Sequence, residues 1–318
     1  YDPCARIRFS FVIVRILPVD PLSDVLSLLK PRSYLSAGLD AGGDWAISFA
    51  APEGIKFNAV LRGSGWLMVE GEAEPQRLEE GDCFLLTRGR PFVLASDLSL
   101  PRIDAQPIYR MAADGIATCN GGGDFFLIGG RFAFSGDHAA VLFDTLPPVV
   151  HVREASSQAS VLRWSLDRLA SELREAQPGG ALMAEHLAHM MLVQILRLHL
   201  GKGNGAGVGW LFALSDRRLG AAVSAMHADP ARRWTLKELA GLAGMSRSTF
   251  AQRFREVVGA PPLGYLTRWR MLVAGDRLRN SRDTVALVAV SLGYESESAF
   301  STAFKRVMAC SPRQYQRG

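Results

Sequence analysis

The stretch LKELAGLAGMSRSTFAQRFREVVGAPPLGYL, Leu236 to Leu266, recurs later in the chain as VALVAVSLGYESESAFSTAFKRVMACSPRQY, Val285 to Tyr315. Small residues match at an offset of 49, in the pairs Ala240 and Ala289, and Gly244 and Gly293. After one inserted residue, larger residues match at an offset of 50, in the pairs Phe250 and Phe300, Phe254 and Phe304, Pro262 and Pro312, and Tyr265 and Tyr315. Because an array of matches at nearly one offset seldom arises by chance, the sequence predicts two copies of one small helical unit.

Each copy has the order helix, turn, helix. In the first copy Ala240 is small enough for two helices to cross closely, Gly244 suits the turn, and Ser246 can cap the next helix. This order is typical of a helix-turn-helix unit, whose second helix enters the major groove of DNA. We predict two such units, at about residues 236–257 and 285–307. The alternative is a helical bundle whose arginines merely solvate its surface.

The charge of the chain favours the DNA-binding interpretation. The whole chain of 318 residues has a net charge of +5, but residues 211–318 alone contain 17 lysines and arginines against 8 aspartates and glutamates. The remaining residues contain 19 basic side chains against 23 acidic ones. A basic C-terminal third beside a mildly acidic remainder indicates an anionic partner for that third only.

The second copy also contains the pattern AxxxGYxSxSxFxxxFKRxxxxSPxxY, which is close to the signature of the AraC/XylS family. The chain from about Asp216 to Arg317 therefore resembles that family's DNA-binding domain. The resemblance implies two helix-turn-helix units joined by a long helix, here Tyr265 to Leu278. The chain departs from the family pattern at Ala309, where glycine is usual, and at Ala303, where arginine or another polar residue is frequent.

The same resemblance implies which side chains face DNA. The base-facing positions are Arg247, Ser248, Ala251 and Gln252 in the first unit, and Glu297, Ser298, Ser301 and Thr302 in the second. Arginine suits guanine, glutamine suits adenine, and glutamate can accept a hydrogen bond from cytosine. The expected phosphate contacts are Arg255, Arg268, Arg270, Lys305, Arg306 and Arg313. Double-stranded promoter DNA is the expected partner, and RNA polymerase is a further candidate.

The front part, from about Pro21 to Pro148, has short apolar runs separated by turn residues, a pattern typical of a β-sandwich or barrel. Phe57 to Leu94 resembles a cupin in its order of strands and Gly-rich turns, which implies a cupin-like sensor domain at residues 20–150. Metal cupins carry an HxH pair and a later histidine. The first slot here reads Phe57-Asn58-Ala59 and the last holds Phe92 or Val93, so we expect no metal and no cofactor.

Without a metal site, the barrel is expected to bind a small molecule or transmit a signal. The side chains that could line an effector pocket are Trp45, Phe57, Asn58, Trp66, Phe84 and Arg90. The competing interpretation is that the apolar ones simply fill a small barrel. The sequence does not separate the two.

Between the barrel and the repeat, the apolar period changes to that of helices. Residues 151–200 predict a helical hairpin, whose second arm, MMLVQILRLHL, is apolar enough to require a packing partner. In the resembling family such a hairpin mediates dimerisation, which implies a homodimer. Residues 201–210 are Gly-rich and predict a flexible linker before the DNA-binding domain at 211–318. The sequence leaves the status of residues 1–19, an N-terminal extension, open.

Together these patterns predict an α+β multidomain fold and a cytoplasmic transcription regulator that is not an enzyme. Four cysteines without CxxC spacing favour a reducing compartment, and no apolar run approaches the roughly 18 residues of a membrane span. One alternative is a redox-sensing regulator of the same architecture that uses Cys83 or Cys119. A further alternative, a cupin enzyme with a nucleic-acid tether, is disfavoured by the missing histidines.

Overall fold

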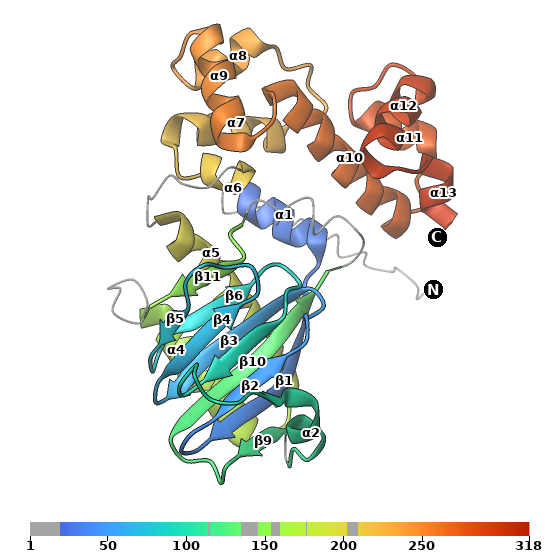
Figure 1. Cartoon of the computed structure of the whole chain (residues 1–318). Helices are drawn as coiled ribbons and strands as arrows, with labels where there is room; N and C mark the ends of the chain where they lie inside the picture. The colour runs from blue at the N-terminus through green and yellow to red at the C-terminus, as the bar shows by residue number, and fades with distance from the viewer. Residues whose placement is uncertain are drawn as a thin grey trace, which may run out of the picture.

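The computed structural model describes residues 20–113, 115–134, 146–153, 160–175, 177–201 and 209–317. The predicted N-terminal extension and residues 202–208 of the predicted linker lie outside these ranges. The described chain forms a β-rich lobe and a helical lobe, with helix α1 (Pro21–Leu29) at the junction between them (Figure 1). The predicted α+β architecture is confirmed.

Two sheets build the β-rich lobe. Their strands are β1 (Arg32–Ala41), β2 (Ala46–Phe49), β3 (Ile55–Arg62), β4 (Gly65–Val69), β5 (Gln76–Leu78), β6 (Cys83–Leu86), β7 (Phe92–Ala95), β8 (Ile103–Asp104), β9 (Ile116–Cys119), β10 (Phe125–Ala133) and β11 (Val149–Val152). The six-stranded sheet has the order β11-β6-β3-β10-β1-β9, and the five-stranded sheet has the order β5-β4-β7-β2-β8. A short helix, α2 (Ala105–Arg110), connects β8 towards β9. Most neighbouring strands are antiparallel, as in the predicted cupin-like domain.

Neighbouring residues on these strands point to opposite faces, which creates two apolar cores. The core between the sheets contains Trp45, Phe84 and Phe125, all nearly inaccessible to solvent. On the outer face of the six-stranded sheet, Phe57 and Phe132 pack in a second core with the long helix α5 (Gly180–Gly201). The sheet therefore separates the interior of the β-rich lobe from the helices that cover it.

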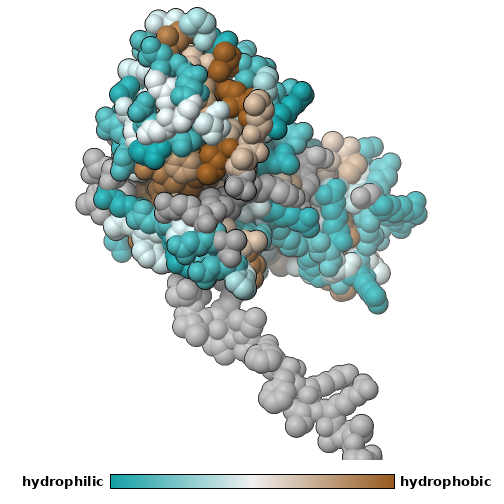
Figure 2. Space-filling model, turned by 90° about the horizontal axis from the view of Figure 1, so that it is seen from below, coloured by the Kyte–Doolittle hydropathy of each residue, from teal (hydrophilic) through white to brown (hydrophobic). Residues whose placement is uncertain are grey.

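The predicted helical hairpin consists of α4 (Ser160–Arg174) and α5. The apolar second arm corresponds to α5, and its residues Met191, Leu192 and Ile195 are buried against the sheet. Four large apolar side chains remain exposed on the hairpin: Val161, Trp164, Leu182 and Met183. Seen from below, the molecule shows a hydrophobic band between hydrophilic regions on one face (Figure 2). No helix in the described ranges is long and apolar enough to cross a membrane.

The helical lobe follows in sequence. Its helices are α6 (Trp210–Ala213), α7 (Arg217–Ala228), α8 (Leu236–Leu242), α9 (Arg247–Val258), α10 (Pro262–Asn280), α11 (Val285–Ser291), α12 (Glu297–Met308) and α13 (Pro312–Arg317). The long helix α10 lies between two small bundles (Figure 1). It begins earlier than the predicted Tyr265 because Pro262, which lacks a backbone N–H, suits the first turn of a helix.

Helix α1 comes from the front of the chain but packs against the helical lobe, on α7 and α10. Lys30 Nζ at its C-terminal end lies 2.8 Å from Asp276 Oδ1 of α10. Asp24 Oδ2 lies 3.5 Å from Nδ1 of the buried His227 in α7, too far for a strong hydrogen bond. Val25 of α1 is buried in the same core. Apolar and charged contacts therefore hold this helix against the helical lobe.

Candidate nucleic-acid interface

Helices α8 and α9 form the first helix pair. Thr235 and Glu238 form a capping box at the start of α8, in which the Thr235 hydroxyl accepts from the Glu238 N–H at 3.2 Å and a Glu238 carboxylate oxygen accepts from the Thr235 N–H at 2.8 Å. Hydrogen bonding from the Thr235 hydroxyl is the main cause that lowers the pKa of Glu238 to about 2. Gly244 makes the turn at φ +61°, and Ser246 caps α9 by accepting from the backbone N–H three residues later.

Helices α11 and α12 repeat this construction with one difference at the end. Gly293 makes the turn at φ +80°, and Ser296 Oγ accepts from the Ala299 N–H at 3.1 Å to cap α12. Helix α9 ends at Gly259 with φ +78°, whereas α12 ends at Ala309 with φ +60°. The left-handed conformation at both positions suits glycine, and only the first unit has one there.

The predicted base-facing side chains lie on the outer faces of α9 and α12. Phe250 and Phe254 of α9 are fully buried, as are Phe300 and Phe304 of α12, which turns the opposite face of each helix outward. The eight predicted residues are exposed or half-buried: Arg247, Ser248, Ala251, Gln252, Glu297, Ser298, Ser301 and Thr302. Each helix therefore presents its four predicted residues on one accessible face near its N-terminus.

Both glutamates at the start of α12 have arginine partners. Glu297 Oε1 lies 3.3 Å from Arg313 Nη2 of α13, at the exposed end of the bundle. Glu295, in the turn before α12, forms an ion pair with Arg233, in the loop before α8. The partners in this second pair are 62 residues apart. Sequence reasoning did not identify either arginine as a partner, because only the tertiary fold brings them together.

Most of the predicted phosphate contacts are solvent-exposed arginines and lysines. Arg255 lies on α9, Arg268 on α10, and Lys305 and Arg306 on the last turn of α12. All four side chains are exposed. Arg313 is also exposed, although its guanidinium contacts Glu297.

Arg270 has a different environment, and the prediction of a phosphate contact at this position needs correction. Its Nε donates to the backbone carbonyl of Pro230 at 2.5 Å, and its Nη2 donates to that of Arg232 at 2.8 Å. The guanidinium also lies over the ring of Tyr294. Its N–H groups are hydrogen-bonded to the loop between α7 and α8, and its guanidinium contacts Tyr294 of the second helix pair. Arg270 is therefore not included among the proposed DNA contacts.

Only part of the set predicted to line an effector pocket in the β-rich lobe comes together. Trp45 and Phe84 belong to the core between the sheets. Phe57 belongs to the core beneath α5, with its ring 6.4 Å from that of Phe132. Asn58 of β3 lies directly opposite Phe84 of β6, so its buried side chain faces the same core as Trp45 and Phe84. Its Nδ2 has no hydrogen-bond partner among the described residues.

The two remaining predicted pocket residues lie at the surface of the barrel. Trp66 is half-buried, with the guanidinium of Arg77 5.3 Å from its ring centre. Arg90 Nη1 lies 3.0 Å from Glu72 Oε1. Trp45, Asn58 and Phe84 thus share the interior between the sheets. Phe57 lies on the other side, because strand alternation sends consecutive side chains of β3 to opposite faces, and Trp66 and Arg90 lie at the surface.

Neither cysteine of the redox alternative has the environment of a reactive thiol. Cys83 is fully buried on β6, and burial raises the pKa of its thiol well above the usual range. Burial likewise raises the pKa of Cys119 on β9. A raised pKa keeps the thiol protonated at neutral pH, whereas the thiolate is the reactive form. The redox alternative therefore receives no support at these two positions.

Comparison with protein families matches both halves of the chain. Residues 20–201 match a family described as "Cupin", and residues 239–318 match one described as "Helix-turn-helix domain". The first match covers more than half of the chain. The second covers most of the helical lobe, including the whole of α9 to α12.

Similar proteins span most of the length of the chain. It is 48% identical over 299 residues to a putative AraC-like transcription regulator of Streptomyces antibioticus, covering 94% of this chain and 99% of that protein. It is 49% identical over 299 residues to a putative AraC-like transcription regulator of Streptomyces lividans, covering 94% and 98%. It is 30% identical over 283 residues to the HTH-type transcriptional regulator AlkR of Acinetobacter baylyi, covering 86% and 91%.

Proposed function

The chain belongs to the family of AraC-like transcription regulators, and on this premise we propose that it recognises promoter DNA with α9 and α12 in two successive major-groove segments. The observation that carries this proposal is the pairing of two Ser-capped helices, each with buried phenylalanines behind it and accessible polar side chains in front. The N-terminus of a capped helix also favours nearby anions, such as phosphates.

The two helices offer different chemistry to the bases. Arg247 and Gln252 give α9 donors that match guanine and adenine. Glu297 gives α12 an acceptor, and its contact with Arg313 partly offsets its charge near the phosphates. We infer that α9 contributes more affinity and that α12 contributes more discrimination.

Phosphate contacts are proposed for the exposed basic residues around the two helices. They are Arg255, Arg268, Lys305, Arg306 and Arg313. Each neutralised phosphate releases condensed counterions, so the affinity for DNA should fall steeply with salt.

The remaining parts of the chain have proposed roles in input and assembly. The cupin-like lobe is proposed to receive a signal without a metal, and the α4–α5 hairpin to form a homodimer through its exposed apolar residues, among them Trp164 and Leu182. A dimer would bring two DNA-binding lobes to repeated sites and raise their effective concentration. Contact with RNA polymerase belongs to the same proposal, as the final step in regulating transcription.

Binding of the purified full chain to genomic fragments, measured at several salt concentrations, tests this proposal. We expect selective, salt-dependent binding, and Lys305→Ala should reduce the slope of log affinity against log salt by about 1. Arg102→Ala, which removes an exposed arginine from the β-rich lobe, is the matched control and should leave the slope unchanged. Absence of selective binding, or an equal effect of the two variants, would contradict the proposed interface.

A further inference from the structure

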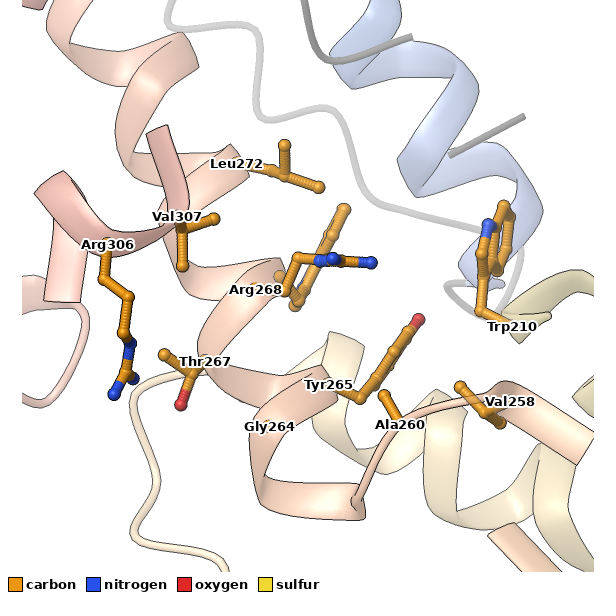
Figure 3. A pocket seen from close by; sticks show the side chains of 11 residues that line it. Trp210, Val258, Ala260, Gly264, Tyr265, Thr267, Arg268, Leu272, Arg306 and Val307 are labelled. Carbon is orange, nitrogen blue, oxygen red and sulfur yellow. The ribbon is translucent and has the colours of Figure 1, made fainter. Parts of the chain in front are cut away.

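A cavity of about 400 Å³ lies within the helical lobe (Figure 3). It is open on one side and is lined by α6, by the end of α9 and the turn into α10, by α10 itself, and by the last turn of α12. None of the eight base-facing residues lines it. Its volume falls in the range of about 300–1,000 Å³ that is typical of small-molecule sites.

The walls of the cavity are mainly aromatic and aliphatic. They include Trp210, Val258, Tyr265, Trp269, Leu272 and Val307. Figure 3 shows Tyr265 and Arg268 extending from α10 towards Trp210 across the hollow. Such walls favour a planar, apolar body that can stack on aromatic rings.

Three hydrogen-bond donors line the cavity together with these apolar side chains. Trp269 is only 5% exposed, and its indole N–H is buried with no hydrogen-bond partner among the described residues. Arg268 and Arg306 also line the cavity, and in the described part of the chain neither has a hydrogen bond or a carboxylate partner. A buried donor without an acceptor is costly, and a guanidinium binds a carboxylate with favourable geometry. All three donors would be satisfied by acceptor oxygens on a ligand.

We propose that this cavity binds an aromatic carboxylate. The ring system would lie against Trp210 and Tyr265 on the side of the cavity, since His227 already stacks on the ring of Trp269. The carboxylate would accept hydrogen bonds from Arg268, and Arg306 would supply a second positive charge at the rim. The indole N–H of Trp269 supplies a further donor for a polar atom of the ligand. The site lies in the helical lobe itself and is separate from the β-rich lobe.

The predicted consequence for regulation rests on the proposed function, since Arg268 and Arg306 are two of the proposed phosphate contacts. A carboxylate bound to these arginines would neutralise charge that otherwise faces DNA. Binding of the ligand would therefore weaken DNA binding directly. By linkage, DNA would weaken binding of the ligand by the same factor.

Isothermal titration of the full chain with 2-naphthoate tests the site independently of DNA. We expect saturable binding of one ligand per chain, about tenfold weaker in Arg268→Ala, because a charge-assisted hydrogen bond is lost. Trp269→Phe keeps an aromatic ring but removes the N–H, and should weaken binding several-fold. Arg255→Ala removes an exposed arginine that does not line the cavity, and should bind the ligand normally. Absence of saturable binding, or unchanged affinity in both cavity variants, would overturn the site.

A second measurement follows DNA affinity while 2-naphthoate is added. DNA binding by the wild-type chain should weaken several-fold, and Arg268→Ala should require more ligand for the same loss. Unchanged DNA affinity at saturating ligand would overturn the regulatory part of the proposal. If the ligand-free chain bound no DNA selectively, the proposed function would fail, while the calorimetric result would still decide the cavity.

Discussion

The α8–α9 pair and the α11–α12 pair share their caps, turns and buried phenylalanines, but the two turns have different neighbours. A Cβ built on Gly244, in the first turn, would meet nothing within 4 Å. A Cβ on Gly293, in the second, would lie 2.0 Å from the carbonyl oxygen of Ala231, in the loop before α8. Gly244 is therefore required only by the conformation of its own turn, whereas Gly293 is also required by the contact of its turn with the loop before α8. The two copies share their local structure, but only the second copy uses its turn for this contact.

The difference between the two turns can be tested by substituting each glycine with alanine, which adds one methyl group to each turn. Gly293→Ala should destabilise the full chain by about 3–5 kcal/mol, because it combines a positive φ with a backbone clash. Gly244→Ala, the matched control, should cost about 1–2 kcal/mol, since only its positive φ is unfavourable. Urea unfolding followed by circular dichroism would measure both. Equal losses would show that the contact with Ala231 does not hold the units together.

A second prediction compares the two helices as readers of DNA. Arg247→Ala should weaken selective binding by about 1–3 kcal/mol and relax the preference at one base pair, because it removes a bidentate donor. The corresponding position on α12 is Glu297, which cannot replace that donor. Fluorescence anisotropy with matched and substituted DNA sites would measure the effect. A uniform loss on all sequences would instead make Arg247 a phosphate contact.

Helix α1 contacts α7 and α10, the helices that precede the two helix pairs, at equivalent positions with opposite chemistry. Asp24 approaches His227 of α7, and Lys30 pairs with Asp276 of α10, 49 residues further along. His227 is buried, and Nε2 lies 2.6 Å from the Tyr265 hydroxyl. The ring of His227 also stacks on Trp269 at 4.0 Å between centres. Helix α7 thus contains a buried imidazole where α10 has a partly exposed carboxylate.

This difference predicts that the free energy of unfolding depends on pH through His227 of α7. Burial lowers the pKa of His227 below its ordinary value, against the opposing influence of Asp24. As pH falls below about 6.5, the unfolded chain takes up a proton that the folded chain does not, so the free energy of unfolding decreases. The loss continues until pH reaches the lowered pKa of the folded state, by at most about 1.4 kcal/mol per pH unit. Above that window this contribution is fully present.

Thermal unfolding of the full chain between pH 7.5 and 5 checks this prediction. His227→Gln should flatten the decrease in this range. His186→Gln, which removes an exposed histidine on α5, should retain the wild-type dependence. An unchanged slope in His227→Gln would assign the pH dependence to other groups.

The sequence predicted the parts of the structure that depend on neighbouring residues. The repeat located both helix pairs, since Ser246 and Ser296 cap their helices as expected. The eight residues predicted to face the bases share accessible faces because the phenylalanines fix the buried side. Long-range contacts could not be predicted in this way. The engagement of Arg270 with the loop before α8, and the packing of α1 on the helical lobe, join residues far apart in sequence.

The sensor region illustrates the same limit. The apolar runs predicted strands, but they did not predict which strand neighbours which, or which face of each strand meets the other sheet. The six predicted pocket residues were chosen by type and motif position, and the register of β3 separates Phe57 from Asn58. The cavity in the helical lobe was missed because its walls come from four elements. Its strongest signal in the sequence was the presence of Trp210 and Trp269 beside a DNA-binding motif.

A smaller effect is expected at the C-terminal ends of α9 and α12. Ala309 adopts φ +60° where Gly259 occupies the equivalent left-handed position. Ala309→Gly should therefore stabilise the chain by about 0.5–1 kcal/mol, by relieving an unfavourable conformation at some cost in chain entropy. Gly259→Ala should produce a loss of similar size. Urea unfolding would measure both, and a destabilising Ala309→Gly would show that the methyl group contributes packing.

The smallest expected change in affinity concerns the acidic start of α12. Glu297 and Arg313 are both accessible, so their ion pair contributes at most about 1 kcal/mol. Glu297→Gln should leave stability nearly unchanged and raise nonspecific DNA affinity only slightly. It should nevertheless change the preferred base, because a carboxylate accepts from cytosine whereas an amide also donates to adenine. Glu295→Gln makes the same change of charge two residues earlier, but loses an ion pair with Arg233 and no base contact. Selection from a randomised DNA library should change the preferred base at one position for Glu297→Gln and at no position for Glu295→Gln. Identical selected sequences for both variants would mean that α12 positions the protein without reading the bases.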